Sequence, residues 1–187
     1  MTKTQYYTAT SIDGFIADEH NSLDWLFAVE RDTDDFPAFF ANVGAFAAGA
    51  TTYRWLLEHE RVLGEPAKWR RWYGDTPAWV FSHHDLPAIP GAALTFVSGD
   101  IRPVHAEMTK AAQGKNIWLV GGGELVGNFA DHGLLDEVIL GIAPVTLGAG
   151  AAVLPRRLEA AQLKLREVRR NGQLVRLTYG VGKSRSA

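Results

Sequence analysis

Three consecutive glycines, at positions 121 to 123, are the residues whose type and spacing most clearly suggest chemistry. They follow the apolar run Ile117–Val120 and precede a helix-like stretch, Glu124–Ala130. A helix start leaves backbone N–H groups unpaired and slightly positive, and glycine lets an anion come close to them. The order of strand, glycine turn and helix therefore predicts a seat for a phosphate or pyrophosphate. The alternative is a tight turn without a ligand.

The motif differs from the two best-known phosphate loops. A dinucleotide fingerprint that starts at Gly121 requires glycine at the position of Val126, and a P-loop that ends at Gly127 requires lysine in place of Asn128. The ordinary Rossmann and P-loop interpretations therefore lose support. No metal site is predicted, because the chain has no cysteine and the histidines at 20, 59, 105 and 132 lack the spacing of a helical metal pair.

Four other apolar segments end in small or polar residues, as the triple-glycine segment does. Their turns contain Asp13-Gly14, Gly49 with Thr51, Ser82-His83, and Ser98-Gly99. In open α/β sheets, ligands bind beyond the carboxyl ends of the strands. Each turn alone is more typical of a structural role. Together the five turns predict a row of backbone amides and hydroxyls that suits an extended ligand with several phosphates.

The elements that must position these turns alternate along the chain. Unbroken apolar runs predict strands at 6–10, 44–48, 78–81, 94–97, 117–120 and 138–142, and helical patterns fall at 35–43, 52–59, 104–113 and 124–130. This alternation predicts an α/β fold whose mostly parallel central sheet carries helices on its faces. Segments 163–169 and 174–179 flank Asn171-Gly172, which predicts a C-terminal antiparallel hairpin. A surface helix that buries one tryptophan is expected around Trp69-Arg-Arg-Trp72.

Composition limits the possible classes of protein. The 187 residues are enough for one domain, predicted at 1–182, with a frayed tail at 183–187. A net charge of -2 gives no basic surface for nucleic acid. No apolar run approaches the roughly 18 residues of a membrane span, and the N-terminus has no signal-peptide core. A cytoplasmic location is the expectation.

From about residue 4 to residue 180, the chain resembles the dihydrofolate-reductase-like reductases. It looks most like the C-terminal reductase domain of the bifunctional riboflavin biosynthesis protein RibD and its stand-alone relatives. The glycine motif and the downstream pattern at 135–140 and 144–150 are the specific part of the resemblance. The matching segments are Ser11–Ala17, Gly49–Tyr53, Val80–Ser82, Ile117–Leu125, Leu135–Leu140 and Pro144–Gly150.

The resemblance implies a three-layer dihydrofolate reductase-like fold that binds NADPH. Ser82 and His83 would lie by the adenosine 2′-phosphate. Many relatives have arginine at the position of Ala50, so the preference for NADPH over NADH is expected to be modest unless His83, His84 or Arg54 compensates. The residues implied beside the nicotinamide are Ala9, Gly14, Phe15 and Ile16, and those implied at the pyrophosphate are Gly49, Thr51, Thr52, Gly121, Gly122, Gly123, Glu124, Leu125 and Val126.

The substrate side needs a source of protons. Hydride transfer to a C=N or C=O bond leaves negative charge, which an acid or an ordered water must neutralise. Asp13 is the candidate catalytic acid, with a purely structural role in its turn as the alternative. Asp35 is either a ligand for a substrate or a favourable charge at a helix start. The resemblance places the substrate between the first strand and the first helix, where the candidates are Asp24, Trp25, Asp35, Phe36 and Phe39.

The favoured function is NADPH-dependent reduction of a small heterocyclic or carbonyl compound, as in the 5-amino-6-(5-phosphoribosylamino)uracil reductase of riboflavin biosynthesis. One alternative is a dihydrofolate reductase, although Thr33 stands where its first-helix acid is expected. The other is a non-catalytic nucleotide-binding module of the same fold. A homodimer is expected, because the hairpin would leave an exposed strand edge near the apolar segment 142–148. A monomer whose edge is protected by Lys164, Arg166 and Arg169 is the alternative.

Overall fold

Strands with unbroken apolar sequences form the centre of the molecule, because helices cover both of their faces. The computed structural model describes residues 1–32 and 35–182. The predicted frayed tail and Thr33 lie outside the described residues. The strands of the main sheet are β1 (Thr4–Thr10), β3 (Val43–Gly49), β4 (Ala78–Phe81), β5 (Leu94–Val97), β6 (Asn116–Gly121), β7 (Glu137–Ile142), β9 (Leu163–Asn171) and β10 (Leu174–Val181).

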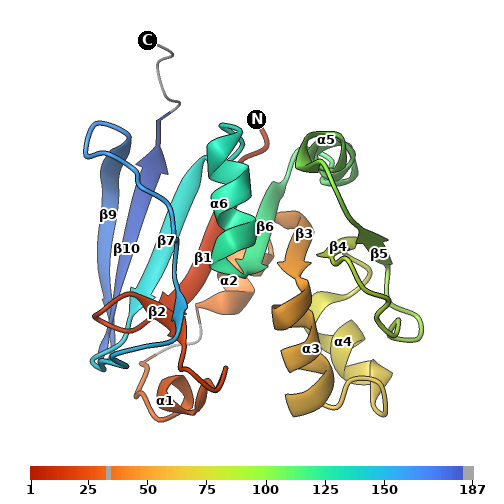
Figure 1. Cartoon of the computed structure of the whole chain (residues 1–187), viewed down its shortest axis with the longest axis horizontal. Helices are drawn as coiled ribbons and strands as arrows, with labels where there is room; N and C mark the ends of the chain where they lie inside the picture. Colours follow the sequence, from red (N-terminus) through yellow and green to blue (C-terminus); the bar gives the residue numbers. More distant parts are fainter. Residues whose placement is uncertain (33–34, 183–187) are drawn as a thin grey trace.

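The pairing of these strands confirms the predicted fold class. Across the described part of the chain, the sheet has the order β5-β4-β3-β6-β1-β7-β10-β9 (Figure 1). Neighbours from β5 to β7 are parallel, whereas β10 pairs antiparallel with both β7 and β9. The sheet is therefore mostly parallel and ends in the C-terminal hairpin.

Two groups of helices complete a three-layer structure. On one face, Met108 and Phe129 are fully buried against Tyr6 of the sheet. On the other face, Tyr53 and Trp69 pack with strand residues such as Phe46. The buried Trp69 confirms the predicted surface helix. The first face carries α5 (Ile101–Ala111) and α6 (Gly123–Asp131), and the second carries α2 (Phe36–Phe40), α3 (Ala50–His59) and α4 (Pro66–Tyr73).

Two of the four predicted helices differ from their predicted bounds by three residues at one end, and the other two differ by at most two residues. Helix α2 is shorter than predicted, because the chain already enters strand β3 at Val43. Helix α5 begins three residues early, because the Asp100 side chain accepts a hydrogen bond from the backbone N–H of Arg102 at 3.0 Å and caps the helix start. Each helix in the described part of the chain falls short of the length and apolarity that crossing a membrane requires.

Three short elements were not predicted. They are α1 (Asp24–Phe27), β2 (Phe15–Ala17) and β8 (Ala151–Ala152), which are too short to show a periodic pattern. Strands β2 and β8 pair antiparallel with each other, outside the main sheet. We refer to these two strands together as the β2–β8 wall.

The hairpin turn lies one residue later than its sequence suggested. Asn171 pairs with Leu174, so Gly172 and Gln173 form the turn, and Gly172 has a positive φ of 60°. Asn171 instead ends β9 with its side chain buried. Its Oδ1 accepts a hydrogen bond from the backbone N–H of Asp32 at 3.0 Å, and its Nδ2 donates to Asp35 at 3.2 Å. These bonds tie the hairpin to the segment that leads into α2.

Candidate active site

The carboxyl ends of the parallel strands open into three adjoining cavities. The central cavity, of about 570 Å³, lies where β3 and β6 lead into α3 and α6. The β4 cavity, of about 270 Å³, shares Thr51, Gly122 and Glu124 with it. The α2 cavity, of about 310 Å³, shares Thr8 and Val120 with the central cavity. Because of these shared residues, the three cavities are neighbours along the sheet edge, and we refer to them together as the groove.

Two helices start beside each other in this groove. The N-cap residues of α3 and α6 are Gly49 and Gly122, and neither helix start has a side-chain cap. A Cβ atom built on Gly122 would lie 3.9 Å from the Cα of Gly49, so the two helix starts are adjacent. The exposed start of α5, by contrast, is capped by Asp100. Two adjacent uncapped helix starts supply the N–H groups and partial positive charge that a pyrophosphate requires.

Each of the three positions in the motif favours glycine for a different structural reason. Gly122 has a φ of 91°, a conformation that side chains with a Cβ rarely adopt. Gly123 lets the 151–155 segment cross α6, because a Cβ there would collide with the Ala152 carbonyl and lie 2.8 Å from Pro155 Cδ. At Gly121, a Cβ would lie 3.3 Å from the Thr52 hydroxyl. Gly122 is therefore the glycine of the motif whose backbone conformation the groove depends on.

Most of the residues predicted for the cofactor line the groove. Those in the central cavity are Ile16, Thr51, Thr52, Gly121, Gly122, Gly123 and Glu124, and those in the β4 cavity are Gly49, Thr51, Ser82, His83, Gly122, Glu124 and Leu125. Ala9 lines the α2 cavity instead.

Three of the predicted cofactor residues have other roles. Val126 is fully buried in the core, and its N–H donates to the carbonyl of Gly122 at 3.1 Å, so it is not free to bind a phosphate. Gly14 and Phe15 build the β2–β8 wall: the Gly14 carbonyl accepts a hydrogen bond from Val153 at 2.8 Å, and Phe15 pairs with Ala152. Neither is among the residues that line the cavities.

Asp13 also lies outside the residues that line the three cavities. Its carboxylate accepts hydrogen bonds from the Ser11 hydroxyl at 2.6 Å and from the N–H groups of Leu147 and Gly148 at 3.1 and 2.7 Å. The bond from Ser11, followed by that from Gly148, lowers the pKa of this exposed carboxyl. The structure therefore supports the turn-forming alternative for Asp13 and gives the catalytic prediction no support.

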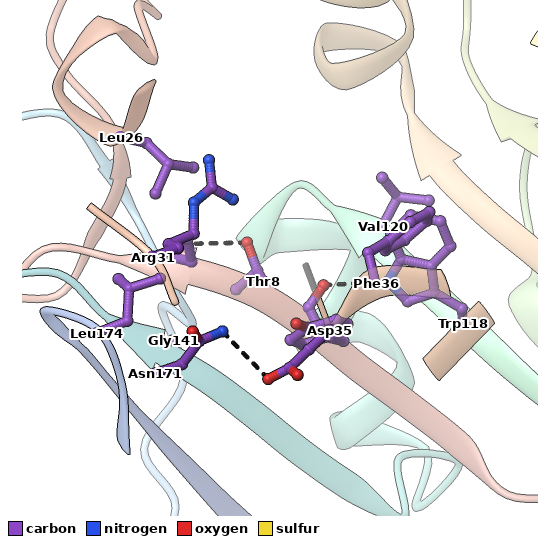
Figure 2. Close-up of a pocket in the computed structure, with 12 residues that line it drawn as sticks. Thr8, Leu26, Arg31, Asp35, Phe36, Trp118, Val120, Gly141, Asn171 and Leu174 are labelled. Carbon is purple, nitrogen blue, oxygen red and sulfur yellow. Dashed lines mark hydrogen bonds between the residues drawn. The ribbon is translucent and has the colours of Figure 1, made fainter. Parts of the chain in front are cut away.

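The α2 cavity is lined by two of the residues predicted for the substrate, Asp35 and Phe36 (Figure 2). Phe36 and Trp118 give it aromatic walls, and their ring centroids are 5.2 Å apart. Asp35 is the only carboxylate among the described residues that line this cavity. Its Oδ2 accepts hydrogen bonds from Arg176 Nη1 at 3.1 Å and from Asn171 Nδ2 at 3.2 Å. These contacts fix the position of a largely buried carboxylate.

The other predicted substrate residues are not among the described residues that line the α2 cavity. Phe39 packs behind it, with its ring centroid 4.5 Å from that of Tyr7. Asp24 and Trp25 belong to α1, which contributes Leu26 to the cavity instead. Sequence reasoning missed Arg31, which lines the cavity, and the two residues that hold Asp35. In the alternating apolar and polar pattern of the hairpin strands, Arg176 is simply one of the polar residues. The Asn171-Gly172 pair predicts a turn, so the sequence assigns Asn171 to that turn.

Charged groups are sparse in the rest of the groove. Among the described lining residues of the β4 cavity, His83 is the only basic one, and Ala50 occupies the helix start beside it. Burial, with the nearby charge of Glu60, raises the pKa of Tyr73 in the central cavity to about 12, so its phenol is neutral. Within residues 1–32 and 35–182, no group of three or more His, Cys, Asp or Glu side chains could hold a metal ion.

Comparison with known proteins gives matches in both sequence and structure. The sequence matches the RibD C-terminal domain family over residues 70–176, more than half of the chain. The uncharacterized protein YwjB of Bacillus subtilis (strain 168) is 33% identical over 178 residues, which are 95% of this chain and 97% of that protein. A Shewanella sp. PV-4 protein assigned to riboflavin biosynthesis has a TM-score of 0.76 at 25% identity, with 96% of this chain and 98% of that chain covered.

Two solved structures with lower identity share the fold. A deaminase/5-amino-6-(5-phosphoribosylamino)uracil reductase from Thermotoga maritima has a TM-score of 0.62 at 16% identity, covering 96% of this chain and 56% of that one. Dihydrofolate reductase from Enterococcus faecalis, complexed with NADP(H), has a TM-score of 0.57 at 10% identity, covering 96% of each chain. These matches confirm the resemblance inferred from the sequence and the dihydrofolate reductase-like fold.

Proposed function

The chain belongs to the RibD C-terminal domain family, and on that premise we propose that it is an NADPH-dependent reductase of a small heterocyclic or carbonyl substrate. The activity would resemble the 5-amino-6-(5-phosphoribosylamino)uracil reductase named for the Thermotoga maritima protein. The observation that carries the proposal is the pair of uncapped helix starts at Gly49 and Gly122, which face one groove. That groove includes a cavity with a single carboxylate among its described lining residues.

The residues of the groove fit a dinucleotide. The starts of α3 and α6 would hold its pyrophosphate, and the β4 cavity with Ser82 and His83 would receive the adenosine end. The central cavity would receive the nicotinamide end, whose chemistry when bound is the supply of a hydride. Thr8 and Val120 line both the central and the α2 cavity, so cofactor and substrate would meet there.

On the substrate side, this chain's residues would bind and orient a planar molecule. Phe36 and Trp118 supply an apolar surface for a ring, and they exclude water from part of the cavity. The Asp35 carboxylate, held by Arg176 and Asn171, can accept hydrogen bonds from the N–H groups of a heterocycle. Once it has taken up a proton from solvent, it can pass that proton to the substrate. A dihydrofolate-type substrate fits the same chemistry and is the second candidate.

Two measurements test the proposed function. Fluorescence titration with NADPH should show saturable binding, which a protein without the cofactor site would not show. An absorbance assay of NADPH oxidation should then be run with the ribosylamino-pyrimidine, with dihydrofolate and with simple carbonyl compounds. Turnover with the pyrimidine supports the proposed activity, and turnover with dihydrofolate alone supports the second candidate. Binding without turnover across this panel would favour the non-catalytic nucleotide-binding module.

The choice between NADPH and NADH should respond to position 50. Ala50 offers no charge to a phosphate, so wild-type protein should prefer NADPH by less than about a thousandfold, or roughly 4 kcal/mol. Ala50→Arg should raise this preference, because arginine pairs with phosphate through two hydrogen bonds. Ala50→Met is the control, since it adds length without charge and should leave the preference unchanged. The preference is measured as the ratio of the two dissociation constants. A wild-type preference above a thousandfold would contradict the argument.

We also propose that the protein is a homodimer. By the strand pairing, Leu165, Val168 and Val175 lie on one face of the β9–β10 hairpin, and they are 51%, 60% and 41% exposed. Val175 pairs with Ile142, so the apolar segment 142–148 begins beside this face. An exposed apolar surface at a sheet edge is commonly buried against a second copy. Light scattering at micromolar concentration should give about twice the mass of 20.5 kDa, and Val168→Asp should halve it. A wild-type mass near 20.5 kDa would instead support a monomer with a protected edge.

A further inference from the structure

A carboxylate belongs to the helix start at which the proposed cofactor would bind its phosphate. Glu124 lies in the first turn of α6, and it lines both the central and the β4 cavity. A negative charge in that position opposes the binding of an anion, since like charges repel even when water screens them. The groove therefore needs a positive charge that cancels Glu124 if α6 is to receive a phosphate.

Arg156 supplies that charge from outside the groove. Its Nη1 lies 3.0 Å from Glu124 Oε2, and its Nε lies 2.8 Å from Asp131 Oδ2. A third contact joins its Nη2 to Asn128 Oδ1 at 3.4 Å. Residues 124, 128 and 131 share one face of α6 because a helix repeats every 3.6 residues. The guanidinium thus lies along the helix and contacts it near both ends.

A glycine makes room for this arrangement. A Cβ built on Gly127 would lie 2.8 Å from Arg156 Cζ and 2.9 Å from its Cγ and Nε, so any other residue would lift the side chain off the helix. The Arg156 side chain is accordingly only 25% exposed, whereas that of Glu124 is 75% exposed. The neighbouring backbone is held as well, because Pro155 and Ala152 pack where a Cβ on Gly123 would collide. Arg156 is therefore fixed in place beside the helix start.

We infer that Arg156 is a positioning residue for the cofactor, which acts by offsetting the charge of Glu124 at the start of α6, while its second partner, Asp131, lies at the far end of the helix. This inference rests on the proposed NADPH site. Arg156 is not among the described residues that line the groove, so it works through Glu124 and not by direct contact. Without it, the Glu124 carboxylate would face the phosphate uncompensated, and NADPH would bind less tightly.

A mutant cycle separates this charge effect from simple packing. Arg156→Gln should weaken NADPH binding about tenfold, as measured by fluorescence titration, and the loss should shrink at high salt because salt screens the exposed charge of Glu124. Glu124→Gln should bind NADPH at least as tightly as wild type. The double variant Glu124→Gln/Arg156→Gln should recover to within about threefold of wild type, because the charge that Arg156 cancels is gone.

The matched control is Arg157→Gln, which removes the next arginine along the chain. Arg157 is 88% exposed and pairs with Glu159, so its loss should leave NADPH affinity unchanged. If Arg156→Gln fails to fold, Arg156→Lys is the variant to measure in its place. It keeps the charge but loses the guanidinium packing, so near wild-type affinity supports the charge effect and a tenfold loss overturns it.

The outcomes distinguish this inference from the proposed function. If wild-type protein shows no NADPH binding, the proposed function fails and the inference fails with it. If wild-type protein binds NADPH but Arg156→Gln binds equally well, only the role of Arg156 is overturned. The same holds if the double variant stays as weak as Arg156→Gln, because packing of the 151–157 segment would then explain the loss.

Discussion

Replacing Gly122 with valine is expected to weaken NADPH binding by at least tenfold, about 1.4 kcal/mol. Gly122 caps α6 with a φ of 91°, a conformation that a β-branched residue adopts only with strain. Its missing side chain also leaves the starts of α3 and α6 open to the groove, with Gly49 only 3.9 Å from where a Cβ would stand. Valine would place two methyl groups where the phosphate must approach. Fluorescence titration of the folded variant measures the effect.

Gly114→Val separates the loss of the phosphate site from general backbone strain. Gly114 has a comparable φ of 85°, and no neighbouring atom lies within 4 Å of the position that its Cβ would take. It belongs to the turn between α5 and β6, away from the cavities. Both variants should lose thermal stability, but only Gly122→Val should lose affinity. If a folded Gly122→Val protein bound NADPH as wild type does, the cofactor would have to lie elsewhere.

The sheet could be predicted because its strands are buried on both faces. Such strands have unbroken apolar sequences, and strands 78–81 and 94–97 were predicted with the bounds that the structure has. Their carboxyl ends then define where a ligand binds, which is why the glycine turn and the helix starts could be identified without a structure. The cofactor side of the groove thus depends mainly on local sequence.

Local sequence was less informative where a residue has two plausible roles. Val126 follows the glycine motif closely, yet it lies on the buried face of α6 and packs in the core. Asp13 stands at a strand end, but the loop residues Leu147 and Gly148 occupy its carboxylate from far along the chain. The spacing of a residue within its own motif does not indicate which distant segment will reach it.

The substrate side depends most on distant contacts. Asp35 was a candidate from its place near the first helix, but its partners Asn171 and Arg176 are 136 and 141 residues away in the sequence. They reach Asp35 because β10 pairs with β7 and the hairpin turn is displaced to Gly172-Gln173. The sequence around these residues indicates neither the pairing of β10 with β7 nor the shift of the turn by one residue. Asn171 and Arg176 therefore could not be assigned to the site from the sequence.

Asp35→Asn is expected to lower kcat/KM by at least about a hundredfold, the usual minimum contribution of a positioned acid or base. Asp35 is the only carboxylate among the described residues that line the α2 cavity, so no neighbour there can replace it. Asparagine keeps the shape and one acceptor oxygen for Arg176 and Asn171, but it cannot exchange a proton. The dissociation constant of NADPH should change less than about threefold, because Asp35 does not line the cofactor cavities.

Glu167→Gln is the matched control, because it also removes a carboxylate that pairs with Arg176. Glu167 Oε2 lies 4.0 Å from Arg176 Nη2, and Glu167 is not among the described residues that line the α2 cavity. It should retain nearly full activity, whereas Asp35→Asn should not. Thermal unfolding of both variants checks whether loss of an ion pair to Arg176 has destabilised the fold. If Asp35→Asn remained folded and kept wild-type kcat/KM on the substrate identified in the absorbance assay, the proton would have to come from an ordered water. Asp35 would then serve only to hold the hairpin against α2 through Arg176 and Asn171.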